Sequence, residues 1–158
     1  AYYKRVPDNF KKFQPECKSI ALQECSREQV VNSFDNTILY TDHFLSQAIQ
    51  WLKKSNATHA TAMLYVSDHG ESLGENNLYL HGLPYRVAPD VQKRVPWISW
   101  WSQQFETQTG LSSACLKKKT NAPLTHDNYF HSVLGMVGVS TEVYQAKLDV
   151  HADCRTPS

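Results

Sequence analysis

The sequence lacks the features of a membrane-spanning or nucleic-acid-binding chain. Its longest apolar stretches fall far short of the roughly 20 residues that a transmembrane helix needs. There are 16 Lys and Arg against 15 Asp and Glu, with no basic tract and no heptad pattern. The resulting net charge of +1 gives no electrostatic reason to expect nucleic acid as a partner. None of the four cysteines forms a Cys-x-x-Cys pair, which argues against a zinc ribbon or a thioredoxin-like site.

The sequence also has no initiating Met, no signal peptide and no evident domain boundary. Its 158 residues fit one domain and suffice to bury a real core. We therefore interpret residues 1–158 as a segment of a single domain within a longer polypeptide.

The stretch from Ala62 to His81, AMLYVSDHGESLGENNLYLH, carries the strongest signal for chemistry. Its apolar run, residues 63–66, contains a β-branched and an aromatic residue and predicts a buried strand. Asp68 and His69 follow at the end of that strand, which is where ligands bind in open α/β sheets. A carboxylate and an imidazole on neighbouring residues can both reach one Zn²⁺ ion. The sequence thus predicts a candidate cation site at Asp68 and His69.

A second imidazole, His81, lies in a loop rich in Gly and Asn that can fold back towards this site. The residues alone leave simpler interpretations open. The Asp-His pair also suits an ordinary turn with an Asx cap, and His81 suits a solvated loop. Glu71 and Glu75 can equally be solvated carboxylates, and Ser72 an ordinary turn hydroxyl.

A long helix is predicted from the capping box of Ser26 and Gln29 to about Lys54. Its expected buried stripe recurs at helical spacing: Val30, Phe34, Ile38, Thr41, Leu45, Ala48 and Leu52. Asp35 and Asn36 lie off this stripe, and we expect them on a solvated face. Residues 42–43 repeat the Asp-His dipeptide inside the helix, and we assign them no metal role.

A second strand is predicted over residues 95–101, where Trp100 and Trp101 suit either a core or a surface near lipid. Residues 103–122 are polar and loop-like, and a helix is expected after Thr125, closed by Gly138. Its apolar face should comprise Phe130, Val133, Leu134 and Val137. The succession of helix, strand, site loop and strand predicts an α/β fold with a central sheet flanked by helices.

Residues 65–97, YVSDHGESLGENNLYLHGLPYRVAPDVQKRVPW, resemble the C-terminal part of the catalytic domain of bacterial lipid A phosphoethanolamine transferases. This family includes intrinsic and mobile colistin-resistance enzymes and belongs to the alkaline phosphatase and sulfatase superfamily. The resemblance continues in AYYKRVP, NSFDNTILY, THDNYFHSVLGMVGV and the closing cysteine region, although Val6 departs from the expected tyrosine. It implies a periplasmic catalytic domain, attached to a membrane domain on the periplasmic face of the inner membrane.

The resemblance also implies the chemistry. The expected reaction transfers phosphoethanolamine from phosphatidylethanolamine to a lipid A phosphate through a covalent phosphothreonine, and confers polymyxin resistance. Asp68 and His69 would be zinc ligands, and His81 would bind the phosphoryl group or a second zinc. A glutamate ligand, the threonine nucleophile and a further histidine precede Ala1 in the family's order. We therefore expect this chain to hold only half of a catalytic site.

The four cysteines suit two disulfides, because the count is even and no redox motif is present. Disulfides would place the chain in the periplasm or outside the cell. The pairing of Cys17 with Cys25 is also implied by the resemblance, whereas Cys115 with Cys154 follows mainly by elimination. The alternative is four reduced, buried thiols.

Two other functions remain open from the sequence. A sister enzyme of the superfamily, such as a phosphoglycerol transferase, a sulfatase or a phosphodiesterase, would share the Asp-His pair. A non-catalytic disulfide-bonded binding domain is the alternative from another class. It predicts that replacing Asp68 and His69 changes nothing but stability.

Overall fold

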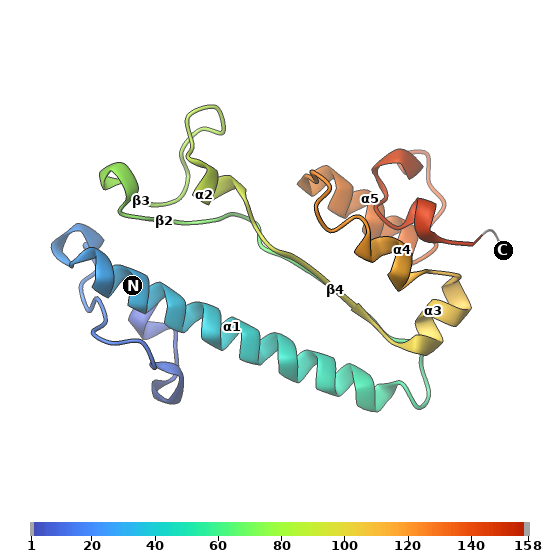
Figure 1. The fold of residues 1–158 in the computed structure, drawn as a ribbon, viewed down its shortest axis with the longest axis horizontal. Helices are drawn as coiled ribbons and strands as arrows, with labels where there is room; N and C mark the ends of the chain where they lie inside the picture. The colour runs from blue at the N-terminus through green and yellow to red at the C-terminus, as the bar shows by residue number, and fades with distance from the viewer. Residues whose placement is uncertain (1, 157–158) are drawn as a thin grey trace. The chain divides into compact units, whose positions relative to one another are not determined.

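The structure is a computed structural model that describes residues 2–156. Its helices and strands in chain order are α1 (Arg27–Ser55), β1 (Ala62–Val66), β2 (Ser72–Leu73), β3 (Tyr79–Leu80), α2 (Asp90–Lys93), β4 (Trp97–Trp101), α3 (Gln103–Thr109), α4 (Ser113–Lys117) and α5 (His126–Met136) (Figure 1). Short 3-10 turns of three residues each lie along the rest of the described chain. Within residues 2–156, no helix is long and apolar enough to cross a membrane.

The chain divides into two compact units. One comprises Ala1–Gln50 and Ser67–Trp97, and the other comprises Trp51–Val66 and Ile98–Ser158. All the residues predicted to carry chemistry belong to the first unit. The second unit holds β1, which precedes the site in sequence, most of β4, which follows it, and the C-terminal helices.

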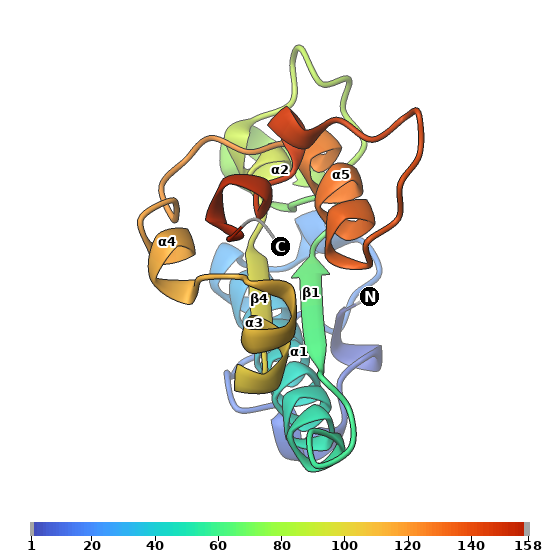
Figure 2. The same cartoon turned by 90° about the vertical axis from the view of Figure 1, so that its right-hand side faces the viewer.

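Strands β1 and β4 pair as a two-stranded sheet (Figure 2). At one end the Ser102 N–H donates to the Thr61 carbonyl, and at the other the Ser67 N–H donates to the Pro96 carbonyl, so the strands run in opposite directions. Both predicted strands are therefore present. β1 is half-buried rather than buried, and β4 begins only after Pro96, which has no N–H to give to a ladder.

Helix α1 begins with the predicted capping box. The Ser26 N–H donates to Gln29 Oε1 at 2.9 Å, and the Gln29 N–H donates to Ser26 Oγ at 3.2 Å. The predicted buried stripe is confirmed only in part: Val30 is buried, most of its other positions are half-buried, and Ile38 is exposed. Apart from Val30, the buried positions of α1 are Ser33 and Asn36, whereas the side chain of Ile38 is 52% exposed.

Asn36 is buried because its side chain supplies hydrogen-bond partners for backbone groups of the irregular N-terminal segment. The Phe13 N–H donates to Asn36 Oδ1 at 2.9 Å, and Asn36 Nδ2 donates to the Phe13 carbonyl at 3.0 Å and to Glu16 at 3.0 Å. Ser33 similarly accepts the Cys17 N–H at 2.7 Å. Backbone groups outside a helix or ladder need such partners when they are buried. This requirement overrides the apolar periodicity from which the stripe was predicted.

Both predicted disulfides form. Cys17 and Cys25 are bonded with their Cα atoms 5.6 Å apart, and Cys115 and Cys154 are bonded with theirs 5.5 Å apart. The first closes the segment that leads into α1. The second ties the C-terminal segment to α4, where the Ser112 N–H also donates to the Cys154 carbonyl at 2.8 Å.

The prediction of a loop over residues 103–122 is wrong, because α3 and α4 occupy much of this range. Each helix is opened by a serine: Ser102 Oγ accepts the N–H of Phe105, and Ser112 Oγ accepts the N–H of Cys115. The indole N–H of Trp101 donates to Glu106 and to Ser113 at 2.9 Å. These bonds favour the packed interpretation of Trp101 over a surface near lipid.

Helix α5 begins after Thr125 as predicted. Its buried face carries His131 and Ser132, whereas Phe130 and Val137, predicted to be apolar contacts, are exposed. Both buried side chains accept backbone N–H groups from the C-terminal segment. As on α1, backbone partnering decides which face is buried.

Asp149 is the buried carboxylate of that C-terminal segment. It accepts the Tyr144 hydroxyl and the His151 N–H, each at 2.8 Å, and Arg155 Nη1 lies 3.8 Å away. A Cβ on Gly135 would overlap the Asp149 carboxylate. Only glycine at this position of α5 leaves room for that carboxylate. Burial raises the pKa of Asp149, but the hydrogen bonds from His151 and Tyr144 and the charge of Arg155 outweigh it and lower the pKa.

We expect Asp149 to stabilise the folded chain at neutral pH and to stop doing so in acid. Because its pKa is lower when folded, its contribution is complete above the unfolded value of about 3.9 and is lost as pH falls through the folded value. Replacing Asp149→Asn should cost about 2 kcal/mol at pH 7 and remove this part of the acid dependence. Urea unfolding of both proteins between neutral and acidic pH tests this, and parallel pH profiles would contradict it.

Candidate metal and phosphoryl site

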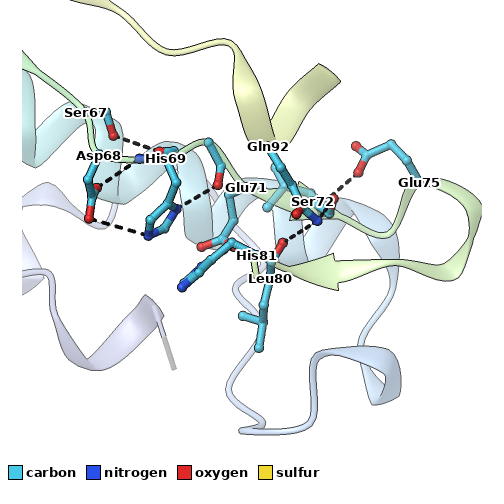
Figure 3. A network of polar contacts seen from close by, with 11 residues as sticks. Ser67, Asp68, His69, Glu71, Ser72, Glu75, Leu80, His81 and Gln92 are labelled. Atoms are coloured by element: carbon cyan, nitrogen blue, oxygen red, sulfur yellow. Dashed lines mark hydrogen bonds and ion pairs between the residues drawn. The ribbon is translucent and has the colours of Figure 1, made fainter. Parts of the chain in front are cut away.

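The segment after β1 is held by backbone hydrogen bonds to the chain around α2. The Gly70 N–H donates to the Gln92 carbonyl at 3.0 Å, and the Ser67 hydroxyl donates to the His69 carbonyl at 2.8 Å (Figure 3). A Cβ on Gly70 would overlap the Val91 carbonyl oxygen. Gly70 is thus required by this close approach of two backbone segments. The predicted turn therefore has a fixed position against α2.

Asp68 and His69 present two donor atoms side by side. His69 Nδ1 lies 2.8 Å from the Gly70 carbonyl oxygen, which can only accept, so Nδ1 carries the proton. In the neutral imidazole the lone pair is then on Nε2, which lies 3.7 Å from Asp68 Oδ2. Two ligands of a tetrahedral zinc are separated by about 3.3 Å. The pair fits two positions of such a site with a small adjustment of the exposed Asp68 side chain.

His81 lies against His69 although 12 positions separate them in sequence. The ring centroids are 3.6 Å apart and the planes differ by 28°. His81 Nδ1 lies 3.0 Å from Glu71 Oε1, so its N–H donates to the carboxylate and the lone pair of the neutral ring is again on Nε2. A carboxylate that fixes the tautomer in this way is the usual second partner of a metal-binding histidine.

Glu71, which from the sequence alone can be a solvated carboxylate, has a partner in the structure. Its side chain is only 11% exposed and pairs with His81. Tyr2, from the N-terminal segment, lies beside it: burial first, and then the Glu71 charge, raise the pKa of the Tyr2 phenol. The only feature of the sequence that indicates a role for Glu71 at the site is its position, two residues after His69. No pattern in the sequence pointed to Tyr2.

The buried carboxamide of Gln92 links the two segments that form the site, one that follows β1 and one that ends at His81. Its Nε2 donates to Ser72 Oγ at 2.8 Å and to the Leu80 carbonyl at 3.1 Å. Ser72 and Leu80 are also directly opposed in the β2–β3 hairpin. The hairpin and Gln92 together bring the residues just before Ser72 and just after Leu80 to one place. Gln92 gave no signal in the sequence.

The described residues do not by themselves form a complete metal site. Within residues 2–156, no group of three or more His, Cys, Asp or Glu side chains is arranged to hold a metal ion. The second Asp-His dipeptide, Asp42 and His43, is exposed on α1, where the His43 ring lies 4.7 Å from that of Phe10. Asp68 and His69 therefore offer two donor atoms, and the described residues bring no further metal ligand to them.

Residues 1–139 match the Sulfatase family. The chain belongs to the sulfatase family. Its α/β class, predicted from the order of elements, is thereby confirmed. Among curated relatives, it is 46% identical over 155 residues to phosphoethanolamine transferase EptA of Salmonella typhimurium and 41% identical over 142 residues to phosphatidylethanolamine transferase Mcr-1 of Escherichia coli. These alignments cover 98% and 90% of this chain.

Two solved structures extend the comparison. The integral membrane protein lipooligosaccharide phosphoethanolamine transferase A (EptA) of Neisseria meningitidis matches 99% of this chain at 40% identity with a TM-score of 0.94. The C-terminal periplasmic domain of phosphoethanolamine transferase EptC of Campylobacter jejuni matches 99% at 39% identity with a TM-score of 0.86.

The chain spans only part of each of these proteins. It covers 28% of the Salmonella relative and 25% of Mcr-1. It covers 29% of the Neisseria chain and 49% of the Campylobacter domain. The sulfatase fold therefore follows from the comparisons, whereas the activity of a whole protein is a matter for proposal.

We expect Gln92→Leu to destabilise the folded chain by about 2 kcal/mol, because a side chain of similar size would leave the buried Ser72 hydroxyl and the Leu80 carbonyl without their partner. The matched control is Gln47→Leu, at an exposed position on α1, which should change the free energy of unfolding little. Urea denaturation measures both. Equal effects would show that the Gln92 hydrogen bonds do not hold the hairpin.

Proposed function

We propose that the full-length gene product containing this chain transfers phosphoethanolamine from phosphatidylethanolamine to a phosphate of lipid A. The observation that carries the proposal is the pair of stacked imidazoles at the end of β1. Each ring donates its Nδ1 proton to a fixed oxygen, so each offers Nε2 as a ligand or hydrogen-bonding atom. Such a pair beside a carboxylate suits a centre that handles phosphoryl oxygens.

Asp68 Oδ2 and His69 Nε2 are the atoms that would hold zinc. Zinc, when bound, supplies Lewis-acid stabilisation of the charge on a transferring phosphoryl group. The Gly70 carbonyl fixes the His69 tautomer, and the Gly70–Gln92 backbone hydrogen bond fixes the turn. The donor set is that preferred by zinc, an imidazole nitrogen with a carboxylate oxygen. Remaining ligands and the nucleophile would come from other parts of the gene product.

His81 would contact the substrate phosphoryl group or a second zinc. The Glu71 carboxylate orients its ring and stabilises a proton on Nδ1, whether or not Nε2 is also protonated. With Nε2 protonated, the ring donates to a phosphoryl oxygen, and with Nε2 unprotonated it can ligate a metal. Stacking on His69 limits the ring's rotation. Glu71 thus acts as a positioning residue.

The relatives' names support the donor, the acceptor and the location. One name contains phosphoethanolamine, another contains phosphatidylethanolamine, and a third joins lipooligosaccharide to phosphoethanolamine transferase. One neighbour is described as an integral membrane protein and another as a periplasmic domain. We therefore place the reaction at the periplasmic face of the inner membrane.

Polymyxin resistance follows chemically from this reaction. A terminal lipid A phosphate carries between one and two negative charges at neutral pH, and esterification adds an ammonium group and removes an ionisable oxygen. The modified lipid attracts a cationic peptide less strongly. We propose that the gene product confers resistance to colistin by this route.

A sister phosphoglycerol transferase, sulfatase or phosphodiesterase would use the same Asp-His pair. The names of the relatives favour phosphoethanolamine over those substrates. A non-catalytic binding domain would not require two histidines with matched tautomers. Activity measurements on site variants separate these possibilities.

The test is transfer in vesicles containing phosphatidylethanolamine and lipid A, measured by mass spectrometry of the lipid A. We expect the full-length gene product to add one phosphoethanolamine group. His81→Ala should slow transfer by about 100-fold, as loss of one charge-stabilising group does, and Glu71→Gln by about tenfold, as loss of an orienting partner does.

The matched controls are His59→Ala, an exposed turn histidine, and Glu28→Gln, an exposed carboxylate on α1. Both should retain the rate of the unmodified protein. Full activity in His81→Ala would contradict the assigned site. An unmodified protein that transfers no phosphoethanolamine would contradict the proposed reaction.

A further inference from the structure

The loop from Gly82 to Pro89 connects His81 to α2 and exposes apolar side chains in the first unit. Tyr85 is 77% exposed, Val87 is 68% exposed and Leu83 is 38% exposed. Leu80, immediately before His81, is also largely exposed. Isolated apolar residues on a surface are normal, whereas several exposed apolar side chains within one short loop indicate a site of interaction.

The loop is held in shape although its tip is exposed. The N–H groups of Val87 and Ala88 both donate to the Pro84 carbonyl at 2.9 Å, and Ala88 is buried. At the other end, the Leu80 carbonyl accepts from Gln92. The apolar side chains are therefore presented by an anchored turn next to His81.

The charges of this segment are predominantly positive. Residues 82–94 contain Arg86, Lys93 and Arg94 against a single acid, Asp90, which pairs with the last two at 3.5 and 3.2 Å. Lys93 also lies over the Tyr85 ring, 5.3 Å from its centroid. Arg86 is exposed and has no ion-pair partner among the residues that the structure describes.

We propose that the loop Gly82–Pro89 is a membrane-contacting surface whose occupant is an anionic phospholipid bilayer. Leu83, Tyr85 and Val87 enter the interfacial region, and Arg86 contacts lipid phosphates. The membrane–water interface favours aromatic and aliphatic side chains with a basic residue nearby. Each basic residue near an anionic membrane surface strengthens binding. The inference rests on the proposed function, since it assigns this loop the task of holding the lipid donor beside His81.

The competing occupant is another part of the same protein. If a protein segment covers the loop, the apolar side chains of the loop are removed from water without touching lipid. Measurements that report contact with acyl chains separate these two occupants, whereas loss of activity alone would not.

The first measurement is fluorescence of Tyr85→Trp in the full-length gene product, reconstituted in vesicles of phosphatidylethanolamine and phosphatidylglycerol. We expect bromine atoms on the acyl chains to quench the emission that this variant adds to that of the unmodified protein. The control is Ile20→Trp, at an exposed apolar position of the same unit, whose added emission should remain. Added emission from Tyr85→Trp that stays unquenched, or equal quenching of both variants, would overturn the proposal.

The second measurement separates lipid contact from loop structure. Leu83→Ser with Val87→Ser should lower kcat/KM about tenfold, or ~1.4 kcal/mol, for long-chain phosphatidylethanolamine in vesicles. The same variant should leave kcat/KM unchanged for a dispersed short-chain phosphatidylethanolamine. The control, Val139→Ser with Val143→Ser, alters exposed valines of the second unit and should change neither value.

The two measurements also distinguish failure of the proposed function. An unmodified protein inactive on both donors would contradict the transferase, while the fluorescence result would still decide whether the loop meets lipid. A variant equally impaired on both donors would show that the loop acts on the structure of the site, and would overturn the lipid contact.

Discussion

The candidate site depends on the buried carboxamide of Gln92 and the short hairpin that it braces. The backbone carbonyl of Gln92 holds Gly70, and its side chain holds Ser72 and Leu80. These three bonds place the segment after β1 against the segment that ends at His81. The two imidazoles can then stack, and their Nδ1 atoms can find fixed acceptors. The same brace holds one end of the exposed loop that follows.

Buried polar side chains perform a similar task elsewhere in the chain. Asn36 binds the N-terminal segment to α1, and Asp149 orders the C-terminal segment next to α5. In each case a buried side chain supplies hydrogen-bond partners for the polar groups of a stretch without regular secondary structure. A misplaced partner leaves buried groups unsatisfied, which costs more than a lost apolar contact at the surface. The chain is thus organised by polar satisfaction as much as by apolar burial.

Local signals in the sequence predicted much of the fold. Both principal strands, the capping box of α1, the start of α5 and both disulfides follow from residues close together in sequence or from the cysteine count. The buried faces of α1 and α5 were predicted only in part, because Asn36 and His131 are buried to serve distant backbone groups. The helices over residues 103–117 were missed because their serine caps lie in a polar segment. Gln92 could not be predicted, since its three partners converge only in the folded chain.

We propose that Asp68 and His69 form part of a zinc site. The chain supplies its own control, because α1 carries the same dipeptide as Asp42 and His43 on an exposed helical face. The most direct test is zinc content by elemental analysis of the full-length gene product with either dipeptide replaced by Ala-Ala. We expect zinc in the unmodified protein and in the Asp42→Ala, His43→Ala variant, and its loss in the Asp68→Ala, His69→Ala variant. Zinc retained in the latter, or a metal-free full-length protein, would contradict it.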